Sequence, residues 1–132
     1  MTWVSSKRGT LLVPSGTHHN PDLKHLFIIC AIKSDGEELF LVSVSKWRND
    51  LCDATCVLEP GEHPFIIIKS YVLYRKTRIE PSSAIIKGVE AGNLIPREPF
   101  DDSPFARVCT GVLESPQTSW KHKRIYRAWV EA

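Results

Sequence analysis

The chain has 132 residues, of which 42% are hydrophobic and 24% are charged, and its formal net charge is only +2. This length fits a single domain, residues 1–132, that is large enough to bury a hydrophobic core. The composition is that of an ordinary globular protein and excludes a disordered chain, and the weak net charge does not by itself indicate a nucleic-acid-binding protein.

The apolar segments predict a cytoplasmic protein. The N-terminal residues contain no apolar segment of signal-peptide length, and the runs "LFIICAI" and "FIII" are far shorter than the roughly 20 residues of a membrane helix. We therefore expect no membrane partner and four reduced cysteines. Cys30 and Cys109 lie in apolar patterns and are expected to be small core residues.

Short strands dominate the first half of the chain. Residues 10–14 predict a strand that ends at Pro14, and residues 24–32 predict a buried strand because they form an unbroken β-branched and aromatic run. Asp35-Gly36 is a hairpin turn signal. It leads into a strand over residues 39–47, with Ser43 and Ser45 on one face and Val42 and Val44 on the other. Pro60-Gly61 predicts a further turn between a short strand piece and one or two strands within residues 64–80.

Helices are expected in the second half. Ser82 or Ser83 is a candidate N-cap for a helix that closes at Gly92, and residues 93–102 read as a Pro-rich connection. A second helix is predicted over residues 103–115, with Ser103 as N-cap and Pro104 in the first helical position. The tail, residues 116–132, fits either a final strand or a frayed helix.

This order of elements predicts an α+β, mainly β fold. Many short strands with tight turns favour a small, partly closed antiparallel barrel, with one or two short helices and a C-terminal helical extension. We expect the barrel core within about residues 7–92 and the helix and basic tail within residues 93–132.

The segment "KSYVLYRKTRIEPSSAI" combines a strand pattern with a cluster of cations. Strict alternation places Leu73 and Arg75 on one side of the strand and Lys76 and Arg78 on the other. Arg75 and Lys76 are expected to reach solvent at a sheet edge, where charge discourages mispairing. Arg78 stands just before the helix start and is the cation for which we expect a function.

Common catalytic and metal motifs are absent. The sequence has no Gly-rich phosphate loop, nucleophile elbow or HExxH motif. Cys52 and Cys56, with Glu59 and His63 nearby, offer a zinc alternative, but their spacing differs from the paired CxxC arrangement of structural zinc sites. Our main interpretation therefore includes no metal and no cofactor.

Two adjacent histidines, His18 and His19, lie in the first long loop, close to His25. Histidine can transfer protons near neutral pH, and loops often carry functional residues. Solvent-exposed histidines without a role are the competing interpretation.

The segment "SYVLYRKTRIEPSSAI" resembles the strand that leads into a short helix in the PemK/MazF family of toxins. The matching positions are Ser70, Val72, Leu73, Arg78, Ile79 and Ser82 or Ser83. The segments "GTLLVPSG", "KHLFIICAI" and "LFLVSVSKW" are similar to the first three strands of that family. The resemblance covers roughly residues 7–90.

The resemblance implies an SH3-like barrel, usually a homodimer, that cleaves single-stranded RNA without a metal and is neutralised by an acidic antitoxin protein. In such cleavage the RNA 2′-hydroxyl attacks the adjacent phosphorus, a base takes its proton, and a cation with a hydroxyl stabilises the phosphorane. The family's key Arg position is occupied here by Lys24-His25. Ser45 or Ser43 matches its key hydroxyl.

The candidate site follows from this correspondence. Lys24 and Arg78 are expected to bind phosphate, His25 and His18 or His19 are acid–base candidates, and Ser45 is a transition-state donor. His18 is also a candidate RNA contact. An arginine would clamp phosphate with two parallel bonds, whereas Lys24 acts as a point charge.

The tail "WKHKRIYR" interleaves aromatic residues with cations, and two interpretations of it stay open. Such a pattern suits single-stranded RNA, with Lys121, Lys123 and Arg124 holding phosphates. A solvated amphipathic end is the alternative. For the whole protein, the rival to a ribonuclease toxin is a non-catalytic barrel module that binds RNA or a protein partner.

Overall fold

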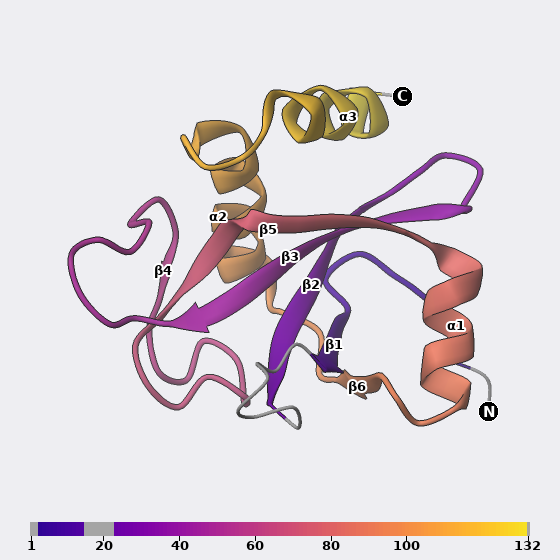
Figure 1. Cartoon of the computed structure of the whole chain (residues 1–132), viewed down its shortest axis with the longest axis horizontal. Coiled ribbons are helices and arrows are strands. Elements are labelled where there is room, and N and C mark those ends of the chain that lie inside the picture. Colours follow the sequence, from indigo (N-terminus) through magenta and orange to yellow (C-terminus); the bar gives the residue numbers. More distant parts are fainter. Residues whose placement is uncertain (1–2, 15–22, 132) are drawn as a thin grey trace.

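We describe residues 3–14 and 23–131 in a computed structural model of the chain. These residues form six strands and three helices (Figure 1). The strands are β1 (Thr10–Pro14), β2 (Lys24–Ile32), β3 (Glu38–Lys46), β4 (Val57–Leu58), β5 (Ser70–Pro81) and β6 (Ile95–Arg97). The helices are α1 (Ser82–Glu90), α2 (Asp102–Glu114) and α3 (Trp120–Glu131).

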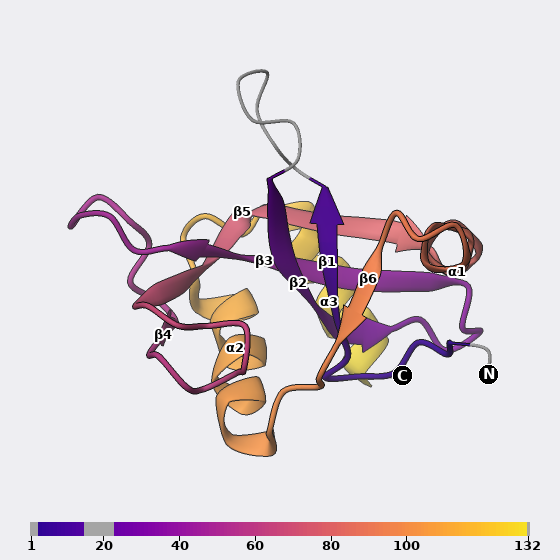
Figure 2. The ribbon, with the colours of Figure 1, turned by 90° about the horizontal axis from the view of Figure 1, so that it is seen from below.

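All six strands belong to one antiparallel sheet with the order β4-β5-β3-β2-β1-β6. The sheet is strongly curled, and Figure 2 shows β1 and β2 running almost at right angles to β3 and β5. The predicted fold class is confirmed: the protein is α+β, mainly β, with a small, partly closed barrel.

The two faces of the sheet bury separate cores. On one face, even-numbered residues of β2 and β3 such as Ile28 and Val42 pack with Val108 of α2 and Tyr126 of α3. Figure 1 shows α2 and α3 together on this side of the sheet. On the opposite face, a second cluster is closed by α1 through Ile85; its buried members are Leu11, Val13, Phe27, Ile29, Leu39, Leu41 and Ile85.

Turn chemistry explains two of the element boundaries. Gly36 has a φ of 76° in the β2–β3 hairpin, and Gly92 has a φ of 79° just after α1. Both values lie in the left-handed region that glycine adopts without strain. The hairpin turn at Asp35-Gly36 and the end of α1 at Gly92 are therefore confirmed.

The structure corrects the predicted starts of both helices, adds one strand and decides between the two assignments of the tail. Helix α1 has Pro81 in the N-cap position, not Ser82 or Ser83. Helix α2 begins at Asp102 with Asp101 in the N-cap position, so Ser103 is not the cap and Pro104 is not the first helical residue. The Pro-rich connection contains an unpredicted strand, β6, whose Pro96 is tolerated because β6 is an edge strand. The ambiguous tail is a helix, α3, rather than a strand.

Strict alternation along β5 was a wrong prediction. Ser43 pairs with Leu73, and Leu41 pairs with Arg78, so β5 advances five residues where β3 advances two. This odd shift of three residues inverts the alternation, and directly paired residues share a face. Arg78 therefore lies on the same face as Leu73, and not on the face of Val72. Arg75 and Lys76, within the irregular stretch, are exposed as expected.

Candidate functional site

A cleft opens where β2 begins and β3 ends. It has a volume of about 330 Å³ and is closed on one side by the segment between β4 and β5. Three of the predicted catalytic residues, Lys24, His25 and Ser45, line it together. The remaining lining residues are Leu23, Leu26, Val44, Lys46, Arg48, Phe65, Ile66, Ile67, Ile68 and Ser70.

The ends of β2 and β3 bring His25 and Ser45 to the same cleft. The pairing of the two strands ends at Phe27 with Ser43, and His25 and Ser45 each lie two residues beyond this pair. Both side chains are half-buried, whereas Lys24 is exposed at the mouth.

Among the described residues that line the cleft, the charged side chains are all cationic. Lys24, Lys46 and Arg48 line it with His25, and none of these described lining residues is a carboxylate. Within residues 3–14 and 23–131, none of these three cations forms an ion pair. The cleft therefore presents a local positive potential that the net charge of +2 does not reveal.

The environment of His25 favours a neutral imidazole. Burial lowers the pKa of His25 below 6.5, and the nearby charges of Arg48 and Lys46 lower the pKa further. A neutral imidazole at physiological pH can accept a proton, which is the protonation state that a general base requires.

The opposite wall of the cleft is apolar and partly exposed. Ile66 anchors this segment in the core at 3% exposure, whereas Phe65 and Ile67 are 36% and 79% exposed. The segment is fixed by His63: its carbonyl accepts the Ile66 N–H at 2.9 Å, and its Nδ1 accepts the Phe65 N–H at 3.0 Å. The guanidinium of Arg97 lies 5.5 Å from the Phe65 ring centroid.

The same contacts contradict the zinc alternative. Because His63 Nδ1 accepts a backbone N–H, its Nε2 carries the proton and donates to the Glu98 carbonyl at 2.6 Å. Neither ring nitrogen is left for a metal. In the described ranges, no three His, Cys, Asp or Glu side chains are grouped so that they could hold a metal ion. Cys30 is a buried core residue as expected, and Cys109 is half-buried against it.

Arg78 lies outside the lining of the cleft. Its guanidinium stacks 5.2 Å from the ring centroid of Phe27, which is two residues from His25 on the same face of β2. Of the four residues predicted to form one site, three lie together in the cleft: Lys24, His25 and Ser45. Arg78 is not part of this group: it pairs with Leu41, four residues before Ser45 on β3, and contacts Phe27.

The other predicted residues are elsewhere. Lys121, Lys123 and Arg124 are on α3, which packs against Phe40 near the other end of the sheet. His18 and His19 lie outside the described residues.

Sequence reasoning missed the residues that complete the cleft. Lys46 and Arg48 directly follow Ser45, and this cationic pair was a usable signal. The run "FIII" was assigned to strands because it is continuous and apolar. It forms the exposed wall instead, since only Ile66 is buried, and no local pattern indicates which isoleucine points inward.

Comparisons with known proteins do not identify the chain. No family model matches it, no curated protein matches it, and no solved structure matches it. Among the helices of the described ranges, none combines the length and apolar character needed to cross a membrane.

Proposed function

We propose that this cleft binds single-stranded RNA and cleaves it without a metal ion, and that the protein is the toxin of a toxin–antitoxin pair. The observation that supports this most is the joint presence of Lys24, His25 and Ser45 in a cleft where no carboxylate is found among the described lining residues. A positive cleft attracts a polyanion, and a neutral imidazole beside a hydroxyl and an ammonium supplies the groups that RNA transesterification needs.

The proposed reaction uses the RNA as its own nucleophile. His25 accepts the proton of the 2′-hydroxyl, the 2′-oxygen attacks the adjacent phosphorus, and the bond from phosphorus to the 5′-oxygen breaks. Lys24 and Arg48 neutralise the charge of the phosphorane, and Ser45 donates a hydrogen bond to it. Water protonates the leaving 5′-oxygen, and the imidazolium of His25 returns its proton to the solvent. The products are a 2′,3′-cyclic phosphate and a 5′-hydroxyl end, so atoms and charge balance without a further co-reactant.

The second candidate is a non-catalytic module that binds RNA or a protein partner in the same cleft. The specific observation in its favour is the exposed apolar wall of Phe65, Ile67 and Ile68 beside the cations. Such a wall can contact bases or an apolar side chain of a protein without any chemistry. A homodimer and an acidic protein inhibitor remain part of the toxin proposal alone.

A cleavage assay with EDTA present separates the two candidates. Wild type should cleave single-stranded RNA of varied sequence, and a 2′-deoxy substitution at the cleaved position should stop the reaction. His25→Ala should lower the rate by about 10²- to 10⁴-fold, the usual contribution of a general base. Lys87→Ala, which removes an exposed cation of α1, is the matched control and should behave as wild type.

The outcomes assign the function clearly. If wild type, Lys24→Ala and His25→Ala proteins are equally inert while the wild type still binds RNA, the non-catalytic module is the correct function. Expression provides an independent readout, because a ribonuclease toxin should arrest growth and its His25→Ala variant should not.

A further inference from the structure

Helix α3 has one buried side and one strongly cationic side. Ile125, Tyr126 and Trp129 face the sheet, and the rings of Tyr126 and Trp129 lie 5.2 and 6.3 Å from the ring of Phe40. The helical period of 3.6 residues places Trp120, Arg124 and Arg127 on the other side. The helix carries four lysines and arginines and one carboxylate, Glu131.

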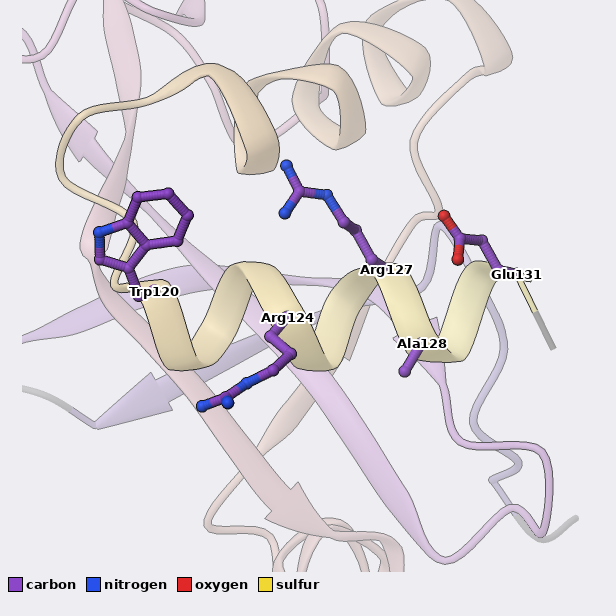
Figure 3. Close-up of a pocket in the computed structure, with 5 residues that line it drawn as sticks. All are labelled: Trp120, Arg124, Arg127, Ala128 and Glu131. Carbon is purple, nitrogen blue, oxygen red and sulfur yellow. The ribbon is translucent and has the colours of Figure 1, made fainter.

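The outward side contains a shallow groove of about 530 Å³. Its lining residues are Trp120, Arg124, Arg127, Ala128 and Glu131, one helical turn apart (Figure 3). In this view the indole of Trp120 and the guanidinium of Arg127 extend to one side of the helix axis and Arg124 extends to the other.

Trp120 is unusual because 81% of it is exposed. The ammonium group of Lys123 lies 5.8 Å from the centroid of its indole, on one face of the ring. The ring is therefore presented to solvent with a cation beside it. Stacking on an indole face and pairing with a nearby cation are the two contacts by which single-stranded nucleic acids are held without sequence preference.

We propose that this surface of α3 binds single-stranded nucleic acid, with a base stacked on Trp120 and phosphates held by Arg124 and Arg127. An acidic protein segment is less well suited, because protein interfaces have an apolar core and Trp120 is the only large apolar residue that lines the groove. Guanidinium groups bind phosphate through paired donors, and Arg124 and Arg127 line the same groove as Trp120, so phosphates and a base can be held along one helix.

The surface is separate from the cleft: the residues that line the groove all belong to α3, whereas those that line the cleft come from residues 23–26, 44–48, 65–68 and 70. If the bound nucleic acid is RNA, this inference rests on the proposed function, because both assume the same ligand. Binding to α3 requires no cleavage, so single-stranded DNA can test the inference separately from catalysis.

The test is binding of a fluorescent single-stranded DNA of about 16 nucleotides, a length typical of such sites, measured by anisotropy at fixed salt. DNA lacks the 2′-hydroxyl and cannot undergo the proposed cleavage. Trp120→Ala should weaken binding by about 5- to 100-fold, since stacking on one aromatic side chain has effects of this size. Trp120→Phe should recover most of the affinity, and Arg124→Ala with Arg127→Ala should weaken binding and reduce its salt dependence.

Lys87→Ala is the matched control, because it removes an exposed cation from α1. The proposal is overturned if Trp120→Ala binds DNA as wild type does, or if Lys87→Ala weakens binding as much as Arg124→Ala. It is also overturned if a polyglutamate peptide binds in a Trp120-dependent manner and DNA does not. Circular dichroism should be unchanged in every variant. If the wild-type protein does not cleave RNA but binds DNA in a Trp120-dependent manner, the proposed catalysis is rejected and the proposed binding surface on α3 is supported.

Discussion

A single methyl group at Gly111 should loosen the helices that carry the cationic surface. Gly111 is buried in the middle of α2, where it faces Tyr74 of β5. A Cβ at this position would overlap the Tyr74 hydroxyl oxygen and lie 2.6 Å from Cζ. Real Cβ contacts are never this close, so the Tyr74 ring would have to move.

The magnitude follows from what holds Tyr74 in place. Its side chain is fully buried, and its hydroxyl donates to the Val108 carbonyl at 2.7 Å. Forcing such a rigid ring aside costs about 3 kcal/mol, the upper part of the overpacking range. Losing the hydrogen bond costs about 1 kcal/mol more. Alanine is favoured over glycine in a helix by about 1 kcal/mol, which leaves a net loss of about 3 kcal/mol for Gly111→Ala.

Urea denaturation followed by circular dichroism measures this loss directly. Gly88→Ala in α1 is the matched control, because the three atoms nearest the added Cβ belong to the side chain of Leu94, at 2.6 to 3.7 Å, and this half-buried side chain can shift. Its effect should stay within about 1 kcal/mol. Tyr74→Phe removes the closest atom, so the double variant with Gly111→Ala should show a favourable coupling in a double-mutant cycle. Gly111→Ala protein that is as stable as wild type, or more stable, refutes the packing argument.

Two pH-dependent predictions complete the set. The pKa of His25 is lowered, so the proposed cleavage should persist as the pH falls below 6.5 and should decline only near the lower pKa of the folded protein. A single-turnover pH–rate profile measures this. If the rate already declines at or above pH 6.5, the role of His25 is contradicted. Arg107 lowers the pKa of Glu62 through hydrogen bonds of 2.6 and 2.9 Å. The pair therefore stabilises the fold at pH values above the pKa of the carboxyl in the unfolded chain. This stabilisation is lost as the pH falls through the lowered pKa of Glu62 in the folded protein. Glu62→Gln should therefore be less stable than wild type at about pH 6 and indistinguishable from it at about pH 2, measured by urea denaturation.

Sequence patterns predicted the parts of the fold that depend on local chemistry. The strands over residues 10–14 and 24–32 have the predicted bounds, because a continuous β-branched run between Pro and Gly signals leaves few alternatives. The choice of Lys24, His25 and Ser45 as one group came from the resemblance to PemK/MazF toxins. The confirmed strand bounds and hairpin place the three residues at adjacent strand ends.

The face of Arg78 could not be predicted from local patterns. It depends on three extra residues in β5 opposite β3, and this irregularity arises from the partner strand and from the packing of Tyr74 under α2. The helical state of the tail has a similar origin. Residues 120–131 fit either period, and the helix is selected because Tyr126 and Trp129 then meet Phe40 on the sheet.

The distribution of charge explains how a chain with a net charge of +2 can present two cationic surfaces. Several acids are committed to structural contacts. Glu62 binds Arg107, Asp102 binds Arg8, and Asp53 accepts the Ser115 hydroxyl at 2.6 Å. The cations of the cleft and of α3 have no such partners in the described part of the chain. Even a paired surface cation stabilises a fold by at most about 1 kcal/mol, so these exposed cations without an ion-pair partner contribute little to the stability of the fold. Their clustering at two places is the observation on which both nucleic-acid-binding proposals rest.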